Sequence, residues 1–259
     1  MPVSKTDFIR GTQCEKMLWL DSHMPHLKII PQKVQELLDQ GNEFGDKAMG
    51  IFGNFTETTA YKEDGRLNYS QMIKTTASLL LKGEEIICEG AFSWLGNFCA
   101  ADILRKRQNQ YDLYEVKNSA FVKQEFLLDL AFQSAILKKC GVNVGKTFLI
   151  LNGDKVDENA LANNKQGGQV CVERIKRDGL TFAIYPVFDK VRILERNVYT
   201  RLFELGKIKK KDALMPNISV GEQCESPYLC WYFHHCHGTC GQDETLKTDD
   251  KTQLEKNVK

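Results

Sequence analysis

Two neighbouring apolar segments of this chain carry side chains that could bind a metal ion and act on a phosphate. Asp102 lies on the first segment, and the second contains Tyr114-Glu115-Val116-Lys117. If the segments form a hairpin with a two-residue turn at Gln108-Asn109, Asp102 faces Glu115 with their Cβ atoms roughly 5 Å apart. Lys117 then projects from the same face. Two carboxylates beside an amine suit a hard divalent cation that activates water.

Four residues are candidate ligands for Mg²⁺ or Mn²⁺, which prefer oxygen donors. They are Asp102, Glu115, the backbone carbonyl of Val116 and, from the preceding segment, Glu89. Lys117 could orient or deprotonate the attacking water. An exposed strand face with one Glu–Lys pair is the simpler alternative for the hairpin, and a surface charge is the alternative for Glu89.

Gln133 is a further candidate, because it lies on the apolar stripe of a predicted helix, where its amide needs a partner. It could hold Lys117, a metal-bound water or a phosphate. In the alternative interpretation it is a core glutamine that the backbone satisfies.

The cysteines form a second group of candidates. Cys14 stands alone near the N-terminus, and three others are spaced evenly near the C-terminus: Cys224, Cys230 and Cys236. Four thiolates can hold a [4Fe–4S] cluster or one tetrahedral Zn²⁺. Further ligand types follow or interleave with them: Cys240, His234, His235 and His237. A reduced packing element rich in cysteine is the remaining alternative.

Composition limits the function classes. The chain has 259 residues, 42% hydrophobic and 27% charged, which is ordinary for a soluble globular protein. A net charge of +1 excludes a globally basic DNA-coating protein, although a local basic groove remains compatible. No apolar run is long enough to span a membrane, and the start resembles no signal peptide, so we expect a cytoplasmic protein. Nine cysteines in a reducing compartment favour metal ligation over disulfides.

The periodicity of apolar residues predicts an α/β fold with a mixed central sheet flanked by helices. Helices are expected at residues 4–11, 15–20, 31–52, 69–82, 124–140 and 182–206, and strands at 85–92, 97–105, 111–116, 146–151 and 170–175. Residues 1–241 are expected to form one domain with its core at about 83–206. The almost wholly polar segment 242–259 is expected to be disordered and dispensable.

The order of these residues resembles that of the iron–sulfur branch of the PD-(D/E)XK nucleases, which includes RecB- and AddB-type nuclease domains and CRISPR-adaptation nucleases. The similar stretches include residues 4–8, 14–20, 101–104, 114–117, 129–133 and 221–236. In this branch, one cysteine before the nuclease core and three after it hold a [4Fe–4S] cluster. The resemblance is closest to an uncharacterised bacterial family of the superfamily.

The resemblance implies a restriction-endonuclease-like core and a small iron–sulfur subdomain, formed by residues 8–20 and 216–241. It implies a metal-dependent deoxyribonuclease, with catalytic residues Asp102, Glu115, Lys117 and Gln133 and cluster ligands Cys14, Cys224, Cys230 and Cys236. The expected cofactors are Mg²⁺ or Mn²⁺ and the cluster, with Zn²⁺ as the alternative. The expected substrate is DNA, single-stranded or with free ends, and protein partners would act in DNA repair, recombination or defence. The alternatives are a non-catalytic nucleic-acid-binding or redox-sensing protein and a zinc-stabilised interaction module.

Two basic clusters could follow a phosphate backbone. One flanks the predicted hairpin turn and the other follows the last long helix: Arg105, Lys106, Arg107, Lys209 and Lys210. Solvated surface charge is the alternative for both.

Overall fold

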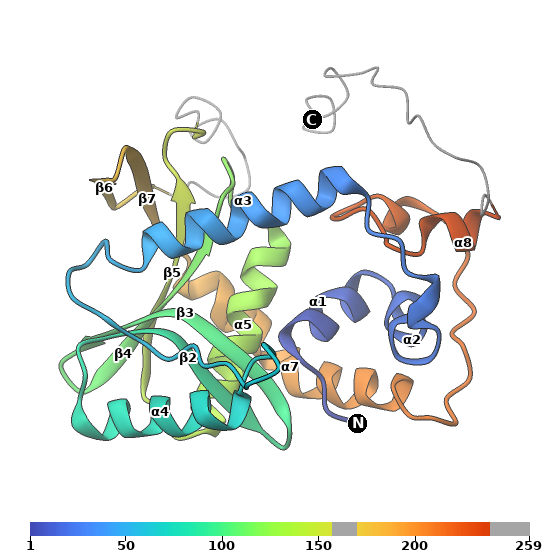
Figure 1. Cartoon of the computed structure of the whole chain (residues 1–259), viewed down its shortest axis with the longest axis horizontal. Coiled ribbons are helices and arrows are strands. Elements are labelled where there is room, and N and C mark those ends of the chain that lie inside the picture. Colours follow the sequence, from blue (N-terminus) through green and yellow to red (C-terminus); the bar gives the residue numbers. More distant parts are fainter. Residues whose placement is uncertain (157–169, 239–259) are drawn as a thin grey trace.

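The computed structural model of this protein describes residues 1–156 and 170–238, and its centre is a seven-stranded sheet (Figure 1). The strand order is β1-β2-β3-β4-β5-β7-β6, in which β1 and β2, and β4 and β5, are parallel and the other neighbours antiparallel. The strands are β1 (Thr56–Glu57), β2 (Ile86–Trp94), β3 (Asn97–Arg107), β4 (Gln110–Lys117), β5 (Val144–Asn152), β6 (Glu173–Arg177) and β7 (Leu180–Pro186).

Helices flank this sheet, which confirms the predicted α/β fold with a mixed sheet. The longer helices are α1 (Lys5–Gln13), α2 (Glu15–His23), α3 (Gln32–Ala48), α4 (Tyr69–Lys82), α5 (Gln124–Lys139) and α7 (Phe188–Ile208). The shorter ones are α8 (Phe233–His237) and the 3-10 turns η1 (Pro25–Leu27) and η2 (Glu222–Cys224). Within the two described ranges, no helix is both long and apolar enough to cross a membrane.

The sheet buries both of its faces. On one face, Leu104 and Leu113 pack in the same apolar cluster as Leu130 of α5 and Leu202 of α7. On the other face, Ile103 and Tyr114 share a cluster with Phe44 and Ala48 of α3. Because side chains alternate along a strand, Asp102, Glu115 and Lys117 belong to the face that α5 covers.

Several predicted elements are confirmed. The helix predicted at 69–82 is α4, and Gly141, with φ of +86°, follows the end of α5, where a left-handed residue commonly ends a helix. Arg107 pairs with Gln110, so the turn between β3 and β4 holds the two residues predicted for it.

The helix predicted over 182–206 is wrong in its first part, because residues 180–186 form β7 and α7 begins at Phe188. Residues 181–185 are all buried, since β7 has apolar clusters on both faces. Such a strand reads as a continuous apolar run rather than as an alternating pattern. The strand predicted at 170–175 lies at 173–177 instead, and the short β1 was not predicted. Residues 157–169, Cys240 and the tail 242–259 lie outside the described residues.

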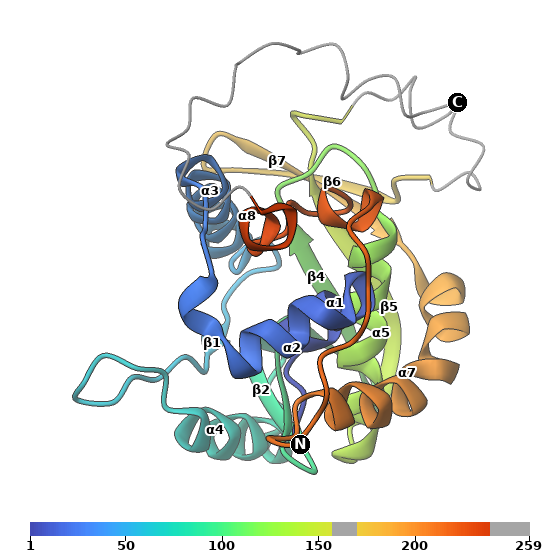
Figure 2. The ribbon, with the colours of Figure 1, turned by 90° about the vertical axis from the view of Figure 1, so that its right-hand side faces the viewer.

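The N-terminal helices pack against the C-terminal part of the chain (Figure 2). Met17 and Leu20 of α2 share an apolar cluster with Cys224, Cys230 and Tyr232. The approach of α1 to α7 requires a glycine, because a Cβ on Gly11 would lie 2.6 Å from the Leu205 side chain. Two regions about two hundred residues apart therefore form one unit beside the sheet.

A capping box fixes the start of α1. Ser4 Oγ accepts a hydrogen bond from Asp7 N, and Asp7 Oδ2 accepts one from Ser4 N. Asp7 also binds Lys209 Nζ at 2.5 Å. Partial burial acts to raise the pKa of Asp7, but the hydrogen bonds from Lys209 and the Ser4 backbone outweigh it and lower this pKa below its ordinary value.

We expect Asp7→Asn to lower the free energy of unfolding by about 1 kcal/mol at pH 7, because Asn keeps an acceptor for Ser4 but loses the ion pair with Lys209. A carboxylate whose pKa is lowered on folding stabilises the folded protein at pH values above the pKa that it has in the unfolded chain. This contribution to stability disappears as the pH falls through the lower pKa of the folded state. Urea unfolding should therefore show a difference at pH 7 that closes below about pH 4. A difference that persists in acid would contradict the assignment to charge.

Candidate carboxylate–lysine site and cysteine pocket

Three acidic residues lie in a row across β2, β3 and β4. Cys88 pairs with Ile103, and Ile103 pairs with Tyr114. The next positions along these three strands are held by Glu89, Asp102 and Glu115. The register that the sequence predicted for Asp102 and Glu115 is thereby confirmed, and Glu89 lies on the strand next to them.

Glu89 has a backbone conformation that is unusual within a strand. Its φ is +54°, and the other described non-glycine residues with positive φ lie in two-residue hairpin turns: Leu95, Gln108 and Asp178. Such a conformation costs roughly 1–3 kcal/mol and is found often at functional sites. Burial raises the pKa of Glu89 to about 7, against the effect of Lys5 and with a contribution from Glu115.

The ladder between β3 and β4 stops just before the acidic row. Its last pair is Ile103 with Tyr114, and beyond it Asp102 Oδ2 accepts a hydrogen bond of 2.7 Å from Val116 N. Because the N–H and C=O of one strand residue point to the same side, the Val116 carbonyl also faces Asp102. Its role as a metal ligand stays a prediction.

Lys117 and Gln133 meet at Glu115. Lys117 Nζ forms an ion pair with Glu115 Oε1, and Gln133 Nε2 donates hydrogen bonds to Glu115 Oε2 and to Asp129 Oδ1. Lys117 Nζ also lies 3.0 Å from Asp129 Oδ2. Glu115 and Gln133 are fully buried, so these contacts are shielded from water. Three of the four residues predicted to be catalytic thus form one connected group with Asp129, and Asp102 joins it through Lys5.

Lys5 completes this group, which we name the carboxylate–lysine patch: Lys5, Glu89, Asp102, Glu115, Lys117, Asp129 and Gln133. Lys5 is the first residue of α1, and its Nζ lies 3.4 Å from Glu115, 3.5 Å from Asp129 and 3.9 Å from Asp102. Sequence reasoning missed Lys5 and Asp129 as site residues. Asp129 lies four residues before Gln133 in a helix, so the spacing could have placed both on one face. No local signal could have identified Lys5, because its contacts join distant parts of the chain.

The carboxyl groups of the patch outnumber its lysines. Burial acts to raise the pKa of Asp129, but Lys5 and Lys117 outweigh it and lower this pKa, so Asp129 is ionised at neutral pH. Burial, together with the negative charges of Asp102 and Asp129, raises the pKa of Glu115 to about 8. Burial also raises the pKa of Asp102. Two lysines thus face four carboxyl groups, and the raised pKa values mean that bound protons offset part of the excess negative charge. A divalent cation would take the place of such protons and favour the ionised carboxylates.

One polar atom of the patch is without a partner. Gln133 Oε1 is buried and accepts no hydrogen bond within the described part of the chain. In the described ranges, no group of three Asp, Glu, His or Cys side chains is already arranged to hold a metal ion. At the patch, the ammonium groups of Lys5 and Lys117 lie among the carboxylates instead.

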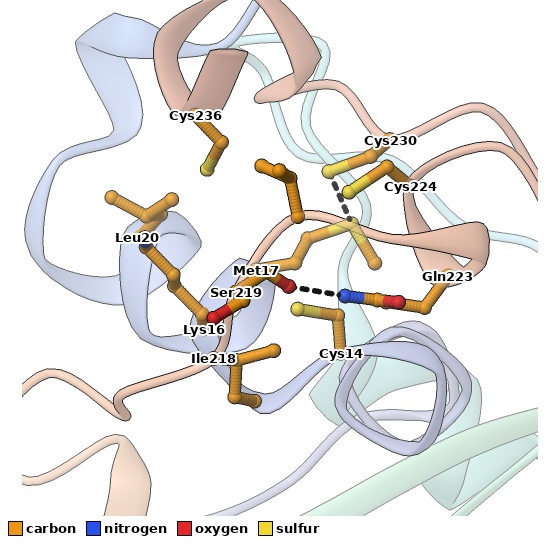
Figure 3. Close-up of a pocket in the computed structure, with 11 residues that line it drawn as sticks. Cys14, Lys16, Met17, Leu20, Ile218, Ser219, Gln223, Cys224, Cys230 and Cys236 are labelled. Carbon is orange, nitrogen blue, oxygen red and sulfur yellow. Dashed lines mark hydrogen bonds between the residues drawn. The ribbon is translucent and has the colours of Figure 1, made fainter.

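The second candidate site is a pocket between α2 and the C-terminal segment. Four cysteines line it, and in Figure 3 their sulfur atoms turn towards its interior: Cys14, Cys224, Cys230 and Cys236. The empty space of the pocket, including its open mouth, is about 310 Å³. Cys230 Sγ lies 3.6 Å from Met17 Sδ, so the thiols also contact an apolar, sulfur-rich wall. We name this site the cysteine pocket.

Four thiols are the donors that an iron–sulfur cluster or Zn²⁺ takes, although these four side chains do not stand in a metal-holding arrangement as they are. Burial raises the pKa of Cys230 to about 11, and the neighbouring thiols Cys14, Cys236 and Cys224 add to this rise. Thiols crowded in this way stay protonated unless a metal ion neutralises the thiolates. Among the described residues that line the pocket there is no histidine, so it offers soft sulfur ligands only.

Helix α1 connects the two sites. Lys5 begins it within the patch, and Cys14 follows its last residue at the cysteine pocket. Gln13 Nε2 donates hydrogen bonds to the carbonyls of Gln223 and Tyr228, which fixes this end of the helix against the cysteine segment. Burial raises the pKa of Tyr228 to about 12, and the charges of Lys117, Glu125, Asp129 and Glu115 also act on it.

The predicted basic residues are not gathered at the patch. Arg105 stacks over Phe52 on the opposite face of the sheet, with its Cζ 4.3 Å from the ring centre. Lys106 Nζ donates a hydrogen bond to Gly83 O, and Arg107 Nε lies 4.0 Å from Asp112. Lys209 is paired with Asp7, while Lys210 is exposed. Their proposed role in nucleic-acid binding stays a prediction.

Comparisons with known proteins add no family to this geometry. A scan against protein-family models finds no match to the chain, and a search of curated proteins finds none either. The geometry of the two sites, and the resemblance of their residues to those of the PD-(D/E)XK nucleases, are therefore the basis of the function proposed below.

Proposed function

We propose that this protein is a metal-dependent nuclease that hydrolyses phosphodiester bonds in DNA. The supporting observation is that Asp102, Glu115 and Lys117 share one partly buried patch with Gln133, as PD-(D/E)XK chemistry requires. Asp102 and Glu115 would hold Mg²⁺ or Mn²⁺ with the Val116 carbonyl and Glu89. The metal ion supplies Lewis acidity, which lowers the pKa of a bound water and neutralises charge on the phosphate.

Lys117 would orient the attacking water and stabilise the negative charge that develops on the phosphate, because its ammonium group already lies beside Glu115 and Asp129. Gln133 would hold Glu115 Oε2 in place through its amide group. Asp129 would position the lysines: its two oxygens contact Lys5 and Lys117, so both can stay anchored when Glu115 turns to a metal ion.

Asp129→Asn tests this division of roles. We expect the cleavage rate to fall by about 10- to 100-fold, because the lysines lose the charge that orients them, whereas Mn²⁺ affinity should change little. Single-turnover cleavage and calorimetric Mn²⁺ titration measure the two effects separately. If Asp129→Asn loses Mn²⁺ binding together with cleavage, Asp129 is instead a metal ligand.

The cysteine pocket would hold a structural [4Fe–4S] cluster on Cys14, Cys224, Cys230 and Cys236. The four cysteines in the lining support this assignment, and Cys₄ coordination of Zn²⁺ is the alternative that the same donors favour. Metal analysis after anaerobic purification distinguishes iron from zinc. In neither case would the pocket take part in the chemical step.

The proposed function is tested with labelled single- and double-stranded DNA, incubated anaerobically with Mg²⁺ or Mn²⁺. We expect cleavage that EDTA abolishes. A comparison of substrates with and without free ends shows whether cleavage requires a free end. DNA binding without any cleavage under either metal would favour the non-catalytic alternative.

A further inference from the structure

Lys5 has three carboxylates as neighbours. Its Nζ lies 3.4 Å from Glu115, 3.5 Å from Asp129 and 3.9 Å from Asp102, and its side chain is 27% exposed. Lys117 already serves two of these carboxylates, Glu115 and Asp129. A second ammonium group in the same space therefore contributes a positive charge where the acidic row is most crowded.

The position of Lys5 coincides with the one that a divalent cation would need. Asp102 and Glu115 are the proposed metal ligands, and the Lys5 ammonium contacts both. A Mg²⁺ ion at about 2.1 Å from those oxygens would lie against this ammonium, and the two positive charges would repel each other. The unpartnered and buried Gln133 Oε1 beside Glu115 is a second sign that the patch lacks a ligand.

We propose that the Lys5 ammonium occupies the divalent-cation position of the patch, so that metal binding requires Lys5 to leave Asp102 and Glu115. This inference rests on the proposed metal site and adds a regulation of it. In the metal-free protein Lys5 holds the carboxylates together, and the incoming cation replaces it.

Only the side chain of Lys5 needs to move. The backbone of α1 is held by its capping box, by the Asp7–Lys209 ion pair and by the packing of Gly11 against Leu205. The lysine stem has four flexible carbons. Asp129, which is not a proposed metal ligand, remains within reach as a partner for the displaced ammonium. Burial acts to lower the pKa of Lys5, but Asp129, Glu115 and Asp102 outweigh it and hold this pKa well above its ordinary value, so the group is charged at neutral pH.

Calorimetric titration of the full-length protein with Mn²⁺ tests the proposal. Lys5→Met should bind Mn²⁺ at least about tenfold more tightly than the wild type, because the competing cation is gone. Lys138→Met is the matched control, since it removes a lysine that is ion-paired with Glu195 outside the patch, and its affinity should stay within about twofold. Equal or weaker binding by Lys5→Met would overturn the proposal while leaving the metal site intact. No Mn²⁺ binding by any of the three proteins would overturn the metal site itself.

A second measurement uses the wild-type protein, in case Lys5→Met does not fold. An amine-reactive acetylating ester modifies exposed lysines, and mass spectrometry gives the rate at each site. Addition of Mg²⁺ should accelerate acetylation of Lys5 at least about threefold, because the displaced group gains access to solvent, while Lys209 reacts at an unchanged rate. Equal rates for Lys5 with and without saturating Mg²⁺ would show that the two cations do not exchange.

Discussion

Glu115→Gln and Lys117→Ala are each expected to reduce DNA cleavage by roughly three orders of magnitude or more, with DNA binding largely retained. Glu115 is fully buried and is contacted by Lys117, Gln133 and Lys5, so an amide in its place cannot supply the charge that a metal ion needs. Lys117→Ala removes the amine that lies two residues after Glu115 on the same face of β4. Single-turnover cleavage and fluorescence anisotropy with labelled DNA measure the two properties.

The control for these variants is the ion pair between Lys138 of α5 and Glu195 of α7, in which the closest atoms are 2.8 Å apart. Lys138→Ala and Glu195→Gln change the same residue types outside the patch and should cleave at the wild-type rate. Because a single change leaves an unbalanced buried charge, the charge-balanced double variant Glu115→Gln/Lys117→Met should fold where a single variant does not. Cleavage by that folded double variant at the wild-type rate would refute the proposed catalytic roles.

Cys14→Ser is expected to remove the brown colour that the proposed cluster would give the anaerobically purified protein, and to lower the melting temperature by about 10 °C or more. Cys14 and Cys224 are about two hundred residues apart, and a clip across a loop of that length contributes roughly 4–5 kcal/mol in the chain-entropy description. The same result is expected for serine at the three other positions that line the cysteine pocket: Cys224, Cys230 and Cys236.

Other cysteines serve as controls for this experiment. Cys88 and Cys171 do not line the pocket, and Cys240 lies outside the described residues, so Ser at each of the three should leave the colour in place. Iron analysis and thermal unfolding followed by circular dichroism provide the measurements. If metal analysis finds about one zinc atom per chain and no iron, the pocket holds Zn²⁺ and not the cluster. Retained colour in Cys14→Ser would exclude the N-terminus from the site.

The sequence by itself determined the local part of the patch. A two-residue turn at Gln108-Asn109 fixes the register of β3 and β4, and strand alternation then sets Asp102, Glu115 and Lys117 on one face. The 3.6-residue period did the same for Gln133 in α5. These relations depend on residues close together in the chain, where the geometry of the backbone leaves few alternatives.

Only the tertiary structure decided what comes to that face from elsewhere. The arrival of Lys5 depends on how α1 packs against α5 and α7, and the meeting of Cys14 with Cys230 depends on contacts across most of the chain. The same distinction explains the wrong helix at 182–186: burial on both faces, a property of the assembled sheet, removed the alternation by which a strand is recognised. Short-range periodicity determines which side chains share a face, whereas long-range packing determines which faces meet.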